Sequence, residues 1–92
     1  EGPAVNARGE VFFTDIPNNR IHKIGLDGTV SVFAEDTGAA NGLMFHADGH
    51  LYAMANARKQ IVRYDPAGKA EVVASNLPGN DLVVTFRDGL FS

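Results

Sequence analysis

Short apolar runs separated by turn residues recur along the whole chain. The runs are rich in Val, Ile, Phe and Tyr, and none carries a helical stripe of useful length. In chain order they are residues 4–5, 11–14, 20–24, 30–34, 43–45, 51–54, 60–64, 71–74 and 82–84. The pattern predicts an all-β protein made of short strands.

The polar segments between these runs contain turn signals. Asp27-Gly28, Asp48-Gly49 and Asp88-Gly89 each stand between two apolar runs. Asp and Gly tolerate the positive φ angles that tight hairpin turns require. We therefore expect consecutive strands to pair as antiparallel hairpins.

The sequence overlays itself when it is shifted by 40 residues. EGPAVNARGEVFF aligns with NGLMFHADGHLYA, and RIHKIGLDGTVSVFA aligns with QIVRYDPAGKAEVVA, without a gap from Glu1 to Ala34. NDLVVTFRDG then aligns with NGLMFHADG at a shift of 39. The chain therefore contains two repeats of four predicted strands and the start of a third.

Four strands in about 40–45 residues are typical of one blade of a β-propeller. The alternative is a four-stranded meander duplicated by chance within a sandwich, and the ungapped period argues against it. We expect residues 1–40 to form one four-stranded antiparallel blade, residues 41–79 a second, and residues 80–92 the first strand of a third.

A propeller blade cannot bury both faces of its sheet, and it is stable because neighbouring blades stack on it. The chain is therefore expected either to be an excerpt of a longer propeller or to assemble with copies of itself. Three chains with two blades each would form a homotrimer of six blades by head-to-tail closure. The strand that begins at Asp81 would then complete, or replace, the first strand of a neighbouring chain.

Charge and composition exclude several classes of partner. The formal net charge is −3 and the basic residues are mostly scattered, so a nucleic-acid-binding face is not expected. The absence of cysteine excludes disulfides and thiolate metal sites. No apolar run approaches the ~18 residues of a membrane span and no signal peptide is visible, so the sequence predicts a soluble chain of unknown compartment. The chain begins at Glu1 without a preceding Met, which indicates processing, trimming or an excerpt.

Blade geometry brings certain polar residues together at one mouth of the central channel. First strands line the channel side by side, and the residues just before them are Glu1, Asn41 and Asn80. Second strands are antiparallel and return to the same mouth, which adds Asp15 and Asn56. Carboxylate and amide oxygens suit a hard divalent cation, calcium above all, and the lack of Cys or a His pair disfavours zinc. The alternative is that these residues form turns by bonding nearby backbone, and it is the favoured role for Asn41 and Asp15.

The three histidines are expected to serve structural roles. His22 and His46 lie in or beside predicted strands, and His50 follows a turn glycine. No pair has a metal-binding spacing, so we expect surface or blade-interface positions for all three. His46 comes closest to a functional position because it lies on a channel-lining strand.

Several stretches together resemble a known family. EGPAV, FFTDIPNNRIHKI, NGLMFHADGHLYA, IVRYDPAGK and NDLVV are similar to elements of the gluconolactonase and senescence-marker-protein-30 family of six-bladed propellers. The resemblance covers essentially all of this chain but only part of a typical member. It implies a metal-dependent lactone hydrolase that often uses calcium.

The resemblance also implies roles for individual residues. Glu1 matches a metal ligand, Asn80 a residue at the metal and substrate, and Asn41 a residue that lines the pocket. Gly79 stands where the family usually has Pro, and the loop MANARKQ departs from the family pattern. Two further ligands, one of them the expected catalytic base or nucleophile, belong to regions that this chain does not contain. The sequence therefore leaves two functions open: hydrolysis of lactones or similar esters, or a non-catalytic, self-assembling propeller module.

Overall fold

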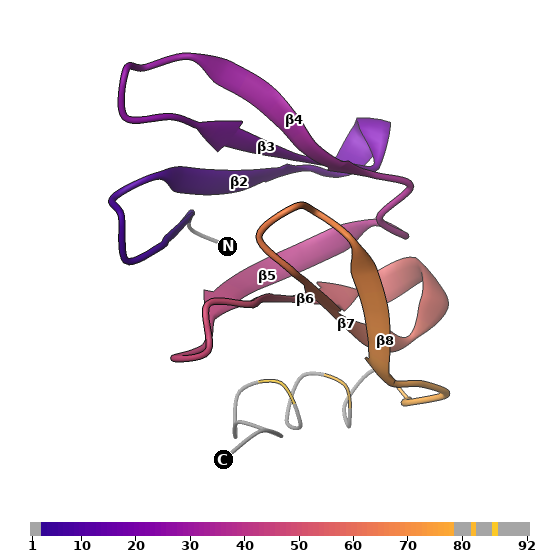
Figure 1. The fold of residues 1–92 in the computed structure, drawn as a ribbon. Helices are drawn as coiled ribbons and strands as arrows, with labels where there is room; N and C mark the ends of the chain where they lie inside the picture. Colours follow the sequence, from indigo (N-terminus) through magenta and orange to yellow (C-terminus); the bar gives the residue numbers. More distant parts are fainter. Residues whose placement is uncertain (1–2, 79–81, 83–85, 87–92) are drawn as a thin grey trace.

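The computed structural model describes residues 3–78, together with Leu82 and Phe86. The first four strands are β1 (Ala4–Val5), β2 (Val11–Asp15), β3 (Arg20–Ile24) and β4 (Val30–Glu35). The next four are β5 (Ala40–Phe45), β6 (Leu51–Ala55), β7 (Gln60–Tyr64) and β8 (Ala70–Ala74). Each set of four forms an antiparallel sheet in chain order, one above the other in Figure 1. The predicted all-β fold of two four-stranded propeller blades is confirmed, and we call the two sheets blade 1 and blade 2.

The two blades repeat one another in their irregular features as well as in their strands. A short 3₁₀ turn follows the second strand of each blade, as η1 (Ile16–Asn18) and η2 (Asn56–Arg58). Each turn ends at a residue in the left-handed region, Asn19 with φ 55° and Lys59 with φ 54°. The third and fourth strands shift register at Ile21/His22 in one blade and at Ile61/Val62 in the other. The 40-residue period therefore reaches the backbone conformation of the loops and bulges.

One face of blade 1 packs against one face of blade 2, and we call this contact the internal interface. Its centre is aromatic, because the ring of Phe12 meets the edges of Phe33 and Phe45 at centroid distances of 4.9 and 5.0 Å. Its buried residues are Ala4, Phe12, Ile21, Ala34, Ala40, Leu51, Ala53, Ala55, Val62 and Tyr64. Both blades thus bury one face each in a single shared core, which a lone four-stranded sheet could not form.

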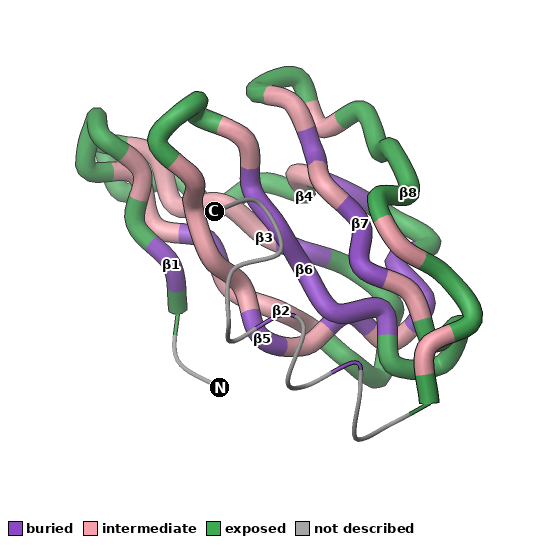
Figure 2. Tube along the Cα trace, turned by 90° about the horizontal axis from the view of Figure 1, so that it is seen from below, coloured by how far each residue is buried: buried purple, intermediate pink, exposed green. Residues whose placement is uncertain are grey.

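The outer faces of the pair differ. On blade 2, Tyr52, Met54 and Ile61 form a second buried cluster, which includes Leu82 and Phe86. On blade 1, the outer face is open, and Val5, Val30 and Val32 are 46–57 % exposed. Figure 2 shows the same contrast, with β6 buried along its length and exposed residues along β4. The pair of blades therefore has one covered end and one open end.

Most of the predicted third-blade strand, residues 80–92, lies outside the described residues. At Leu82 and Phe86, which are described, the backbone is helical rather than extended. The Leu82 N–H donates a hydrogen bond of 2.8 Å to the Pro78 carbonyl, a spacing of four residues. Helical spacing places both side chains on one side, where they cover the outer face of blade 2, whereas alternation along a strand would not follow this period.

No described segment forms a helix with the length and apolar character that a bilayer crossing requires.

Candidate functional site

The predicted channel mouth corresponds to one edge of the blades. In blade 2, Ala40 pairs with Ala55, so the start of β5 and the end of β6 lie at the same edge. Asn41 and Asn56 are therefore near one another along that edge, as the blade geometry predicts. In blade 1, β2 ends at Asp15 and leads directly into η1, the equivalent of η2. Glu1 and Asn80, the two predicted metal ligands, lie outside the described residues.

Asp15 has local partners that account for its carboxylate. The Asn18 amide donates to its two oxygens at 3.2 and 3.0 Å, and His22 Nε2 lies 3.2 Å from one of them. The hydrogen bond from Asn18 and then the contact with His22 lower the pKa of Asp15 below its ordinary value. Asp15 and His22 share the open face of blade 1, where the His22 ring stacks on Phe13 at 5.2 Å. These contacts agree with the turn-forming alternative that the sequence favours for Asp15.

Asn41 also makes a local contact. Its side-chain oxygen accepts a hydrogen bond of 2.9 Å from the Gly42 N–H. Gly42 has φ 65° and lies where the β5–β6 register shifts, so it is the extra residue of a bulge. A glycine adopts this left-handed conformation without strain, which explains the Asn-Gly pair at the entrance of the channel-lining strand. The local bond is the turn role that the sequence favours for Asn41.

The described residues do not themselves form a metal centre. Among residues 3–78, Leu82 and Phe86, no group of three or more His, Asp or Glu side chains is placed to hold an ion. Asp15 and Asn41 have their oxygens engaged locally, and Asn56 is exposed. A calcium site at the mouth would therefore depend on Glu1 and Asn80.

A strap between the blades lies at the same edge, and sequence reasoning missed it. Arg58 of η2 donates through Nη2 to Asp36 Oδ1 at 2.6 Å and through Nη1 to the Asp36 carbonyl at 3.1 Å. The Ala57 N–H donates to the Gly38 carbonyl at 3.0 Å. Asn19 adds a bond from its side chain to the Ala39 N–H at 2.8 Å. The β4–β5 connection is thus attached to the turns of both blades, which fixes the edge where the candidate residues lie.

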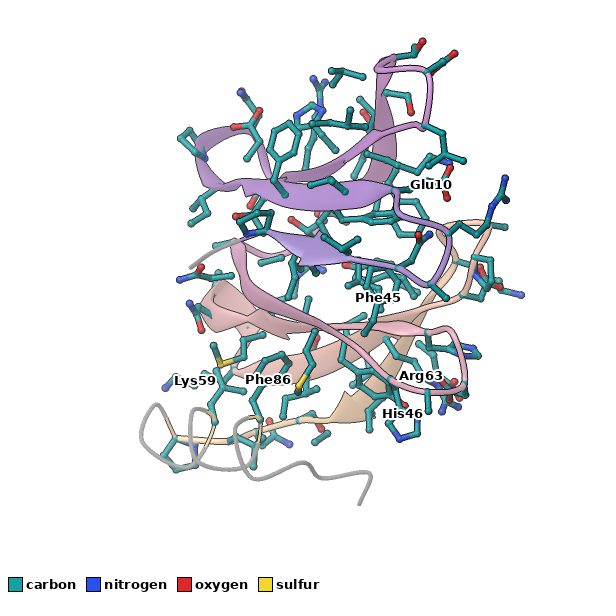
Figure 3. The ribbon with its side chains drawn as sticks, turned by 90° about the vertical axis from the view of Figure 1, so that its left-hand side faces the viewer. Glu10, Phe45, His46, Lys59, Arg63 and Phe86 are labelled. Atoms are coloured by element: carbon teal, nitrogen blue, oxygen red, sulfur yellow. The ribbon has the colours of Figure 1, made fainter. Side chains whose placement is uncertain are left out.

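The opposite edge carries the hairpin turns and a charged cluster. Asp48 Oδ1 lies 3.3 Å from Nδ1 of both His46 and His50, across the β5–β6 turn. The hydrogen bond from the His50 backbone N–H is the main cause that lowers the pKa of Asp48. Arg63 and Glu71 form an ion pair beside this turn, and Figure 3 shows His46 and Arg63 close together. The alternation His-x-Asp-x-His around a turn was the sequence signal for this cluster, and the expectation of isolated histidines overlooked it.

Between the blades, near the same edge, there is a cavity of about 250 Å³. Phe12, Phe33, Phe45 and Tyr64 line its apolar side. Burial raises the pKa of the Tyr64 hydroxyl, so this group stays neutral at ordinary pH. Glu10 and Lys23 stand at the polar side with 3.8 Å between their charged atoms. The cavity is an inter-blade space at the end away from the candidate mouth.

The fold and its edge define the chain as two blades of a β-propeller. No family profile and no curated protein sequence matches the chain. Solved structures do match. A gluconolactonase from Xanthomonas campestris superposes with a TM-score of 0.75 at 30 % identity over 86 % of this chain and 27 % of its own.

Two further matches extend the comparison. A calcium-binding protein, regucalcin from Agrobacterium tumefaciens, matches with a TM-score of 0.70 at 24 % identity, covering 88 % of this chain and 31 % of its own. A streptogramin B lyase matches with a TM-score of 0.74 at 19 % identity, covering 87 % and 28 %. The last two show the fold alone. The resemblance to gluconolactonase-type propellers is confirmed, and the chain spans 27–31 % of the length of these solved structures.

Proposed function

We propose that this chain is the calcium-binding part of a propeller hydrolase that acts on lactones or similar small esters. The observation that carries the proposal is the match to the gluconolactonase, at 30 % identity over most of the chain. The match to regucalcin, a calcium-binding protein by its description, supports the choice of cation. Hard oxygen ligands of the kind present in Glu1 and Asn80 suit calcium.

Glu1 and Asn80 would hold the ion, with Asn41 beside the bound substrate and Asp15 and Asn56 in supporting positions around the mouth. When bound, a calcium ion supplies electrostatic stabilisation for charge that develops on a carbonyl oxygen. Hydrolysis also requires a general base within hydrogen-bonding reach of the attacking water. We name no base in this chain, so the proposed activity requires a residue from further propeller blades or from another copy.

A homo-oligomeric ring is our proposal for how this chain alone could complete a propeller. Three copies would supply six blades and three sets of mouth residues around one axis. Such a ring would bring three Glu1 carboxylates together, and a cation would offset their mutual repulsion. The second candidate function, a non-catalytic self-assembling module, is favoured by the open apolar face of blade 1.

Calcium titration by calorimetry, followed by a lactone hydrolysis assay with calcium and with a chelator, tests the proposal. Glu1→Gln and Asn80→Ala are expected to weaken calcium binding at least tenfold. Glu71→Gln is the matched control, because Glu71 pairs with Arg63 at the opposite edge of blade 2. Equal affinity in Glu1→Gln and in the unchanged chain would contradict the metal assignment. Calcium binding without chelator-sensitive hydrolysis would favour the non-catalytic module.

A further inference from the structure

The outer face of blade 2 is the repeat equivalent of a face that a whole blade covers. Tyr52 and Ile61 stand 40 residues after Phe12 and Ile21. At the internal interface Phe12 and Ile21 are 3 % and 0 % exposed, because the sheet of blade 2 lies on them. The outer face of blade 2 therefore has the composition and geometry of a surface that receives another blade.

In this chain, two side chains cover that face instead of a sheet. Leu82 is 2 % and Phe86 6 % exposed, and both belong to the cluster of Tyr52, Met54 and Ile61. Figure 3 shows Phe86 on the side of blade 2 away from blade 1, directed toward the sheet. We call Leu82 and Phe86 the cap.

The complementary surface is the open face of blade 1. Val5, Val30 and Val32 lie on it. Their repeat equivalents are Phe45, Ala70 and Val72, on the face of blade 2 that blade 1 covers. The internal interface thus shows how the outer face of one pair of blades would meet the open face of another pair.

The open face is more polar than its equivalent at the internal interface. Asp15 and His22 occupy the positions that Ala55 and Val62 hold in blade 2. The Asp15–His22 pair is 3.2 Å apart and partly exposed. Stacking on this face would desolvate a charged pair, so it would be weaker than the internal contact. A weaker contact is one with which two capping side chains can compete.

We propose that the cap is a displaceable plug, which competes with the open face of blade 1 of a second copy for the outer face of blade 2. Head-to-tail stacking then requires Leu82 and Phe86 to leave Tyr52, Met54 and Ile61. The occupant is a second copy because the internal interface already joins these two kinds of face within one chain. This inference rests on the proposed ring, but it holds for any number of stacked copies.

Sedimentation of the 92-residue chain over a range of concentrations tests the plug. Leu82→Ser/Phe86→Ser is expected to lower the concentration at half-assembly at least tenfold, and adding Val32→Asp on the open face should reverse this. A double variant that stays monomeric at every concentration where the unchanged chain does, with an intact β-sheet spectrum, overturns the proposal. Assembly that Val32→Asp leaves unchanged also overturns it, because the copies would then meet elsewhere.

Phe86→Trp keeps the test decisive where the double variant fails to fold. The chain has no tryptophan, so this side chain becomes the sole indole probe. Its emission should be blue-shifted in the monomer and should shift to the red as copies assemble. Emission that stays blue-shifted in the assembled species overturns the plug. None of these readouts involves calcium or lactone, so the proposed hydrolase can fail while the plug stands, and the reverse.

Discussion

Arg58 and Asp36 join the turn of one blade to the connection that follows the other. Arg58 Nη2 lies 2.6 Å from Asp36 Oδ1, and the same guanidinium also donates to the Asp36 carbonyl. The two residues are 22 positions apart in the chain. The Arg58 side chain also lies over Gly38, whose substitution by a larger residue would bring a Cβ to 2.8 Å from Arg58 Cδ. The pair is therefore a packed contact between blades as well as an ion pair.

Arg58→Ala is expected to lower the free energy of unfolding by about 1 kcal/mol, since it removes a two-point contact and the packing of an arginine stem. Arg20→Ala is the control. Arg20 and Glu35 form an ion pair at 3.4 Å on adjacent strands of one blade, and exposed pairs of this kind contribute roughly 0–1 kcal/mol. Urea unfolding of both variants measures the difference. Equal small losses would contradict a role for Arg58 in joining the blades.

Gly68→Ala is expected to be more destabilising than Gly28→Ala. The two glycines occupy the same turn position, 40 residues apart, with φ values of 87° and 84°. Either alanine suffers the strain of the left-handed region, roughly 1–2 kcal/mol. A Cβ on Gly28 would meet open space, whereas a Cβ on Gly68 would clash with the Phe33 backbone carbonyl of blade 1. The difference between the two midpoints of thermal unfolding measures the tightness of blade packing at this turn. Equal midpoints would show that the blades separate there without loss.

The sequence predicted the strands, their pairing and the blade period, because these depend on local alternation and on turn residues that recur every 40 positions. It also predicted which strand ends meet, so Asn41 and Asn56 were placed correctly at one edge. It did not predict the Arg58–Asp36 strap, because an ion pair between loops depends on how two sheets are offset. The helical backbone at Leu82 and Phe86 was missed for a related reason. A short apolar run adopts the conformation that covers the nearest open apolar face, and that choice is tertiary.

Stability should fall as the solution is acidified below about pH 4. Glu10, Asp15, Asp27, Asp48 and Asp65 all have a pKa below the ordinary value, mainly because they accept hydrogen bonds. A carboxyl group with a lowered folded-state pKa contributes stability that is present above its unfolded-state pKa. That contribution is lost as the pH falls through the folded-state pKa. Thermal unfolding at pH 7, 5 and 3 should give similar midpoints at the first two values and a lower one at the third.

The individual share of Asp15 can be separated with Asp15→Asn. An asparagine cannot titrate, so this variant should be less stable than the unchanged chain at pH 7 and should lose less on acidification. Glu35→Gln is the control, since Glu35 forms only an exposed surface pair. An identical pH dependence in Asp15→Asn and in the unchanged chain would show that the Asn18 and His22 contacts do not contribute to acid sensitivity.

Phe12→Ala and Tyr52→Ala compare the two covers that one repeat position receives. Both residues are almost fully buried, at 3 % and 2 % exposed. Phe12 packs under a complete sheet with two aromatic edges, and its loss should lower the free energy of unfolding by about 3–5 kcal/mol. Tyr52 lies under the cap, which can relax onto the smaller side chain, so its loss should be smaller even though Tyr52 also accepts a contact from Arg63. Urea unfolding measures both. Equal losses would mean that Leu82 and Phe86 hold blade 2 as firmly as a neighbouring blade holds blade 1, and a readily displaced cap would then be excluded.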